Sequence, residues 1–190
     1  EEDVFSALPK RADDSHKGDY GRLLHICGSV GFSGAAVLSA MGAARVGAGL
    51  LTVASPASVL VPLTVRLPEA MTLPLALDTE GMMHSSNISR ILEILRNMSA
   101  CLIGCGIGKK DTLYNLLEQV LKTASCPIVV DADGINNLCG RIEILHQAKC
   151  PVILTPHMGE MSRLLGITVA ELRRDRIEKL KSFTEKYGVI

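Results

Sequence analysis

The sequence predicts an α/β protein built on a mostly parallel central sheet. Short apolar, β-branched runs such as Ile128-Val129-Val130 and Val152-Ile153-Leu154 alternate with segments of helical periodicity. Such runs are typical of strands that are buried on both faces of a parallel sheet. The 190 residues are 47% hydrophobic, which is enough to bury the core of one domain.

The strands and helices follow from apolar periodicity and from residues that begin or end helices. Gly47 and Gly49 end one helix, and Asp111 is expected to cap another. Thr168 and Glu171 form a capping-box pattern that begins the last helix. After an irregular lead-in over residues 1–15, strands are expected at 23–27, 50–54, about 72–77, 100–103, 127–130 and 151–154. Helices are expected at about 35–46, 56–67 with an interruption at Pro62, 87–98, 111–122, 140–146, 158–165 and 168–187.

The composition excludes several kinds of partner. Basic and acidic residues number 20 each, so the formal net charge is zero, and no long basic run occurs. We therefore expect no nucleic-acid partner and no acidic membrane surface. Aromatic residues make up 3% of the chain, with no tryptophan, which argues against base-stacking platforms. No apolar run could cross a bilayer and the acidic N-terminus is not a signal peptide, so we expect a cytoplasmic protein.

The six cysteines are predicted to be reduced, buried thiols. Several lie in or beside apolar runs, where a thiol behaves as a small hydrophobic group, and none forms a C-x-x-C motif. A metal site or a disulfide framework is the less favoured alternative. The cysteines stand at positions 27, 101, 105, 126, 139 and 150.

Two glycine-rich turns follow predicted strands. The first contains Gly28, Gly31 and Gly34 and precedes a helix, an arrangement that can bind phosphate because the helix N-terminus offers free amides. It matches neither the dinucleotide fingerprint G-x-G-x-x-G nor a Walker A motif. The second, Gly104–Gly108, lets backbone amides approach a ligand, although a plain flexible turn explains it equally well.

Polar residues follow the strands at 127–130 and 151–154. Ligands bind beyond the carboxyl ends of parallel strands, so these residues are candidates for chemistry. Asp131 and Asp133 could hold Mg²⁺ beside phosphates, or could simply cap a strand-end turn. His157 could contact a ligand or form local hydrogen bonds at a helix N-terminus. Glu160 is expected to be structural because acids favour the first helical turn, and His25 to be a satisfied core histidine.

The last residues, Gly188-Val189-Ile190, resemble the opening of one more strand after a long helix. We therefore expect the sequence to stop inside a fold.

Six motifs in the same order resemble the NAD(P)H-hydrate dehydratase family, the carbohydrate-kinase-like domain of YjeF proteins, from about residue 10 to the end. The combination is far more specific than any single motif. The motifs are His16-Lys17-Gly18-Asp19-Tyr20-Gly21, Gly28-Ser29 with Gly34-Ala35-Ala36, Pro68-Glu69-Ala70-Met71, Gly104-Cys105-Gly106-Ile107-Gly108, Asp131-Ala132-Asp133-Gly134-Ile135-Asn136 and Leu154-Thr155-Pro156-His157-Met158-Gly159-Glu160.

The resemblance implies a ribokinase-like three-layer α/β/α sandwich, with residues 1–190 forming one domain that corresponds to the N-terminal two-thirds of the family domain. It also implies a repair reaction. Hydrated NADH or NADPH is phosphorylated on its hydroxyl by ADP (most bacterial members) or ATP (eukaryotic members), with Mg²⁺. Phosphate then leaves and the reduced cofactor is restored. A homo-oligomer is implied because the family is commonly oligomeric.

The resemblance also assigns site residues. Substrate-binding positions are Ala35 or Ala36, Gly106, Asp131, Asn136 and His157. Nucleotide or phosphate positions are Lys17, Gly104, Asp133 and Thr155, and the metal ligands are Asp131 and Asp133. Lys17 lies in the family's N-terminal signature, which is expected to form a pocket or a subunit contact.

The sequence departs from the family in two places. Cys105 stands where the family usually has proline, which loosens the turn but keeps its glycines. The nucleotide-holding segment and the glycine-rich helix start with the catalytic aspartate are expected beyond Ile190. Two other functions remain open: a small-molecule kinase acting on a hydroxymethyl or hydroxyethyl heterocycle, and a non-catalytic nucleotide-binding or subunit-assembly protein.

Overall fold

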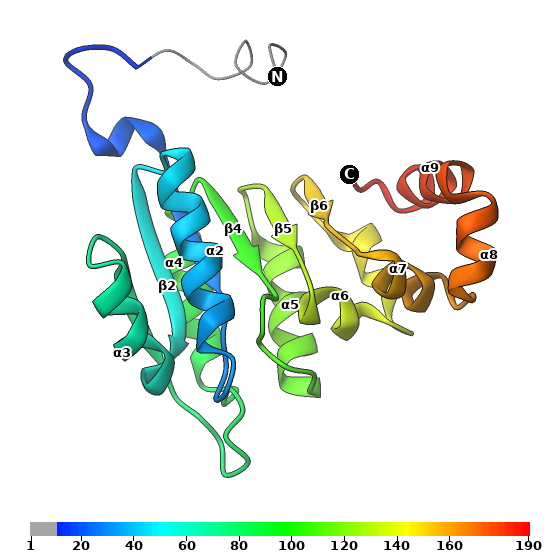
Figure 1. Ribbon diagram of the computed structural model, residues 1–190, viewed down its shortest axis with the longest axis horizontal. Coiled ribbons are helices and arrows are strands. Elements are labelled where there is room, and N and C mark those ends of the chain that lie inside the picture. Colours follow the sequence, from blue (N-terminus) through cyan, green and yellow to red (C-terminus); the bar gives the residue numbers. More distant parts are fainter. Residues whose placement is uncertain (1–10) are drawn as a thin grey trace.

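The computed structural model describes residues 11–190 and is built around a six-stranded sheet (Figure 1). The strand order is β3-β2-β1-β4-β5-β6, and every pairing is parallel. The predicted strands are thus confirmed, with bounds that shift by a few residues. They are β1 (Arg22–Ile26), β2 (Leu50–Pro56), β3 (Met71–Leu75), β4 (Ala100–Ile103), β5 (Ile128–Val130) and β6 (Val152–Leu154).

The strand order reverses between β1 and β4. From β1 the chain moves outward to β2 and β3, then returns to lay β4 on the other side of β1. The connections after β1 and β4 therefore leave in opposite directions, and in open α/β sheets ligands bind beyond the carboxyl ends of the strands at such a switch point. Both predicted glycine-rich turns lie at this edge.

Helices cover both faces of the sheet, as a three-layer sandwich requires. The helices α2 (Ser33–Val46) and α3 (Ala57–Arg66) cover one face, and α4 (Asn87–Leu95) and α5 (Asp111–Thr123) cover the other. Alternation along β1 supplies both cores, because successive strand side chains point to opposite faces. Leu24 and Ile26 enter the core that contains α4 and α5, while Leu23 packs beneath α2 and α3.

The C-terminal third differs most from the prediction. Instead of one helix over 168–187 there are two, α8 (Val169–Arg174) and α9 (Arg176–Tyr187), with a break at Asp175. The capping box at Thr168 is confirmed: its Oγ1 accepts a hydrogen bond from the Glu171 amide at 3.2 Å. No glycine or proline marks the break, so the sequence pattern did not reveal it.

Three other local features differ from the predictions. Residues after β5 form a helix, α6 (Asp133–Leu138), and the helix expected at 140–146 is a 3₁₀ helix, η2 (Ile142–Gln147). Pro62 lies inside α3 without interrupting it, because Val59, Leu60 and Leu63 are held against the sheet. Asp111 is not the N-cap of α5; that position is Lys110, and Asp111 accepts a bond from Arg141 at 2.6 Å. The remaining helices are η1 (Lys17–Tyr20) and α7 (Met158–Leu165).

The end of the chain begins to pair with β6, as the expected additional strand requires. The Ile190 amide donates to the Val152 carbonyl at 2.9 Å, and the Leu154 amide donates to the Ile190 carbonyl at 2.8 Å. Among residues 11–190, no helix combines the length and the apolar character needed to span a membrane.

His25 lies inside β1 with 2% of its surface exposed, as predicted for a core histidine. Its Nδ1 lies 3.4 Å from the Ser39 hydroxyl of α2. Burial disfavours the charged imidazolium and lowers the pKa of His25 to about 4. The folded protein therefore holds this histidine neutral at pH values where the unfolded chain protonates it.

We predict that His25 makes the protein less stable in mild acid. The unfolded-state pKa is about 6.5, so stability is lost as the pH falls from about 6.5 toward 4, by about 2 kcal/mol between pH 7 and pH 5. Urea unfolding of His25→Leu at both pH values should show a correspondingly smaller loss. His84→Gln, at an exposed position, is the control. Equal pH dependence in the two variants would contradict the lowered pKa.

Candidate functional site

The turns after β1 and β4 meet at the carboxyl edge of the sheet. The Gly28 amide donates to the Cys105 carbonyl at 2.8 Å, and the Ser29 hydroxyl donates to the Gly106 carbonyl at 2.7 Å. Two predicted ligand-contacting segments, distant in sequence, thus form one surface at the switch point.

The start of α2 packs directly on these glycines. A Cβ added to Gly106 would lie 2.8 Å from the Cβ of Ala35, and a Cβ added to Gly28 would lie 3.0 Å from the Cβ of Ala36. At such separations only glycine, which has no side chain, fits at positions 28 and 106. The structure therefore brings Ala35, Ala36 and Gly106, three of the predicted substrate-binding residues, side by side.

The end of β4 is equally close to the end of β5. Gly104 has a φ of +134°, and a Cβ on it would overlap the carbonyl oxygen of Asp131. Gly134 approaches from the other side, where a Cβ would lie 2.8 Å from the Ile103 carbonyl oxygen. These two glycines allow Asp131 to lie against the turn after β4.

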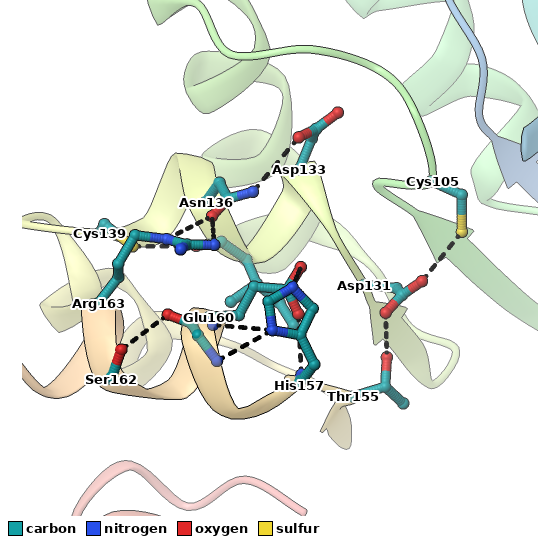
Figure 2. Close-up of polar contacts among 12 residues, drawn as sticks. Cys105, Asp131, Asp133, Asn136, Cys139, Thr155, His157, Glu160, Ser162 and Arg163 are labelled. Carbon is teal, nitrogen blue, oxygen red and sulfur yellow. Dashed lines mark hydrogen bonds and ion pairs between the residues drawn. The ribbon is translucent and has the colours of Figure 1, made fainter. Parts of the chain in front are cut away.

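Asp131 connects the ends of three strands (Figure 2). Its Oδ1 accepts a hydrogen bond from Thr155 after β6 at 2.7 Å, and its Oδ2 accepts one from the Cys105 thiol after β4 at 3.3 Å. The neighbouring Cys27 thiol, burial and the Asp131 carboxylate all raise the pKa of Cys105, so this side chain remains a protonated donor. Cys105, which stands where the family usually has proline, thus holds Asp131, a predicted site residue.

The backbone between Asp131 and Asp133 is strained. Ala132 has φ 49° and ψ −115°, and it is the only residue other than glycine with a positive φ among residues 11–190. Such conformations cost about 1–3 kcal/mol and are concentrated at functional sites. The strained turn at Ala132 also directs Asp133 away from Asp131. The Asp133 Oδ2 accepts a hydrogen bond from the Gly108 amide at 2.9 Å.

Arg163 was not singled out from the sequence, yet it joins the site. Its Nε and Nη2 donate to the Asn136 Oδ1 at 3.1 and 2.9 Å, which ties α7 to α6. The Nδ2 of the same Asn136 amide donates to the Asp133 Oδ1 at 3.3 Å. No sequence signal distinguished Arg163 from other exposed helical arginines.

His157 begins α7 and also caps it. Its Nδ1 accepts hydrogen bonds from the amides of Gly159 at 3.0 Å and Glu160 at 3.2 Å. Nδ1 can accept only when the ring proton is on Nε2, which lies 3.1 Å from the buried Glu160 carboxylate. The local role considered from the sequence is therefore real. Because 66% of the side chain is exposed, the ring can still contact a ligand.

Lys17 does not join the other residues. It lies in η1, before β1, and the backbone of Gly49 before β2 packs against its carbonyl group. In a parallel sheet, residues that precede strands lie at the opposite edge from residues that follow them. Lys17 is therefore separated from the carboxyl-edge site by the length of the strands (Figure 1).

The predicted metal ligands do not converge. Asp131 faces Thr155 and Cys105, whereas Asp133 faces Gly108 and Asn136 (Figure 2). Residues 11–190 contain no group of three or more His, Cys, Asp or Glu side chains arranged to hold a metal ion. The protein residues described here thus do not fit a joint two-carboxylate metal site.

Ser55 is a further residue that sequence reasoning missed. Its hydroxyl is fully buried and has no hydrogen-bond partner among residues 11–190. It lies at the switch point, where a Cβ on Gly28 would come within 2.9 Å of its Oγ. Its neighbours Ala54 and Pro56 line a cavity of about 10 Å³. This volume is about the space that one water molecule needs.

Comparison with known proteins confirms the family that the motifs resemble. The family model described as NAD(P)H-hydrate dehydratase matches residues 23–190. The chain belongs to this family. The match extends from β1 to the last residue and so includes every element at the carboxyl edge of the sheet.

Relatives in the family include single-function and bifunctional enzymes. The chain is 34% identical over 190 residues to the ADP-dependent (S)-NAD(P)H-hydrate dehydratase of Bacillus subtilis, covering all of this chain and 63% of the relative. It is 42% identical over 189 residues to the bifunctional NAD(P)H-hydrate repair enzyme Nnr of Coxiella burnetii, covering 98% of this chain and 36% of the relative. The chain thus spans only part of the length of these relatives.

Solved structures confirm the fold. The Bacillus subtilis ADP/ATP-dependent NAD(P)H-hydrate dehydratase, co-crystallised with ATP and Mg²⁺, superposes with a TM-score of 0.81 at 31% identity, covering 99% of this chain and 62% of that one. A ribokinase-like superfamily protein of Enterococcus faecalis superposes with a TM-score of 0.74 at 24% identity, covering 96% and 61%. The ribokinase-like prediction is therefore correct.

We predict that Gly104→Ala disrupts the site far more than Gly31→Ala. Both glycines have positive φ, but a Cβ on Gly31 meets nothing within 4 Å, whereas one on Gly104 overlaps the Asp131 carbonyl. Gly31→Ala should cost about 1 kcal/mol of backbone strain. Gly104→Ala should cost about 3 kcal/mol or more, because the backbone must also move. Urea unfolding measures both, and equal losses would contradict the close contact.

Proposed function

We propose that this chain provides the hydrate-binding part of an ADP- or ATP-dependent NAD(P)H-hydrate dehydratase that acts in the cytoplasm. Family membership over residues 23–190 supports the proposal. The observation that carries it is the close packing of Ala35 against Gly106 and of Ala36 against Gly28, because it joins the start of α2 to the turns after β1 and β4 at the switch point of the sheet. No observation favours the small-molecule kinase considered from the sequence.

The proposed reaction divides between the residues at the carboxyl edge. The hydrated nicotinamide ring is assigned to Ala35 or Ala36, Gly106 and His157, with Asp131 and Asn136 as polar partners. The backbone of Gly104 and the side chains of Asp133 and Thr155 are assigned to the phosphate side. Phosphorylation of the hydrate hydroxyl turns it into a leaving group, and loss of phosphate restores the ring double bond. The family resemblance assigns the base for the first step to an aspartate after Ile190.

Two assignments change in the light of the geometry. Mg²⁺ neutralises phosphate charge in phosphoryl transfer, and it commonly keeps several waters and takes only one or two carboxylates. A single carboxylate, either Asp131 or Asp133, is therefore the most that these residues are proposed to contribute. Lys17, at the amino edge, is reassigned from phosphate binding to a subunit contact.

The experiment that tests this function is recovery of reduced-nicotinamide absorbance from purified NADH hydrate. Parallel reactions contain ADP with Mg²⁺ or ATP with Mg²⁺. The 190-residue chain and the product of the uninterrupted reading frame that contains it are both assayed. We expect nucleotide-dependent recovery from the reading-frame product, and the better donor identifies the nucleotide. No recovery with either donor would overturn the proposal.

We predict that His157→Asn lowers kcat/KM for hydrate recovery about tenfold or more. Asparagine is a good N-cap, so α7 should remain folded while the imidazole is lost. His84→Asn, at an exposed position on the turn before α4, is the matched control and should leave kcat/KM unchanged. Unchanged activity in His157→Asn would show that His157 serves only as a cap.

We further propose that the protein is a homo-oligomer that associates through the outer face of α2 and α3. Neither helix contains an acidic residue, and both expose large apolar side chains. The exposed fractions are 72% for Leu38, 80% for Val46, 68% for Val61 and 78% for Val65. Val61 and Val65 stand four residues apart on α3 and so lie on the same face of that helix. Exposed apolar patches are typical of protein–protein interfaces.

Light scattering after size exclusion tests the interface. We expect the wild-type protein to be larger than one chain and Val61→Glu/Val65→Glu to be monomeric, because two carboxylates would be buried in the contact. Ile177→Glu, a change at a 62% exposed position on α9, should leave the mass unchanged. A monomeric wild type would overturn the proposal.

A further inference from the structure

We propose that a groove beside His157 binds the diphosphate group of the dinucleotide hydrate through Arg173, Arg174 and Arg176. The inference rests on the proposed function, which assigns His157 to the hydrate. It adds a second part of the substrate site, formed by the end of α8 and the start of α9, where the three arginines follow the last family motif by 13 to 16 residues.

Two adjoining cavities form the groove. One, of about 660 Å³, is lined by His157, Met158 and Met161 together with residues of α9. The other, of about 680 Å³, is lined by Met158 and the three arginines. Met158, Arg176 and Ile177 line both cavities. The two cavities therefore adjoin at these three residues, and together they extend from the exposed ring of His157 to the arginines.

The arginines provide positive charge that no neighbouring acid neutralises. Two acids also line the second cavity, but each is paired with a lysine: Asp175 with Lys179 at 3.2 Å and Glu178 with Lys181 at 3.5 Å. Arg173, Arg174 and Arg176 are exposed and form no ion pair within residues 11–190. Three guanidinium groups at one opening would repel one another unless an anion joins them.

A diphosphate matches this chemistry. Guanidinium groups bind phosphate oxygens through two parallel hydrogen bonds, and arginine stays charged at every relevant pH. Both the dinucleotide and the nucleotide donor contain a diphosphate. The continuity with His157 favours the dinucleotide, because one molecule can then place its nicotinamide end at the switch-point edge and its diphosphate between the arginines. The first cavity, with Met161 and Leu172, offers apolar surface between the two ends.

The test measures binding of NADH and of ADP separately by calorimetry. The protein is the product of the full reading frame, either wild type or Arg173→Gln/Arg174→Gln/Arg176→Gln. NADH retains the diphosphate and does not require the catalytic step. The matched control is Arg66→Gln/Arg90→Gln/Arg96→Gln, which removes three exposed arginines of α3 and the α4 region. We expect the groove variant to raise the Kd for NADH about tenfold or more, since two lost charge-assisted hydrogen bonds suffice. The control should change neither Kd.

The outcomes separate the groove from the reaction. Weaker NADH binding with unchanged ADP binding supports the inference, even if wild-type protein recovers no NADH from its hydrate and the proposed function fails. Weaker ADP binding with unchanged NADH binding assigns the groove to the donor and overturns the inference. Unchanged binding of both, or no NADH binding by wild-type protein, also overturns it. Should the triple variant unfold, the single variants replace it, and at least one must weaken NADH binding.

Discussion

The close approach of β4 and β5 at their carboxyl ends is the constraint on which the site depends. Gly104 and Gly134 let the two strand ends come so near that a Cβ on either would clash with backbone carbonyl groups. This packing brings Asp131 to the turn after β4, where the Cys105 thiol and the Thr155 hydroxyl hold its two oxygens. One pair of glycines thus determines the relative positions of three strand ends, and the bare turn at Gly106 continues the same arrangement toward α2.

The polar groups of this edge are largely satisfied by one another, which makes the edge rigid. Arg163 holds Asn136, Glu160 completes the cap of α7, and Asp133 accepts the Gly108 amide. Two groups stand apart from this network: the ring of His157, whose side chain is 66% exposed, and the buried hydroxyl of Ser55, which has no partner among residues 11–190. Buried hydroxyls without partners are uncommon because desolvation costs about 1–3 kcal/mol, and the neighbouring cavity of about 10 Å³ has space for one water molecule.

Much of the fold could be predicted because its signals are local. Buried β-branched runs identified the strands, and the glycine turns and the Asp131–Asn136 motif identified the edge where they end. The break at Asp175, the continuity of α3 through Pro62 and the helix α6 depend on tertiary packing, which local propensity does not report. Ser55, Arg163 and the separation of Lys17 from the site depend on contacts between distant segments. The six motifs predicted the candidate site residues, but not which carboxylate faces which loop.

The position of Lys17 connects the amino edge to the proposed oligomer. In a parallel sheet η1 cannot reach the carboxyl-edge site of its own chain. It packs instead beside the end of α2, where the Gly49 amide donates to the Tyr20 carbonyl at 3.1 Å and Arg11 donates to the Gly47 carbonyl at 2.8 Å. The exposed Val46 lies next to that helix end. A second chain packed on the apolar face of α2 and α3 would therefore meet η1 as well. In the proposed oligomer, Lys17 would then act between subunits rather than at the carboxyl-edge site of its own chain.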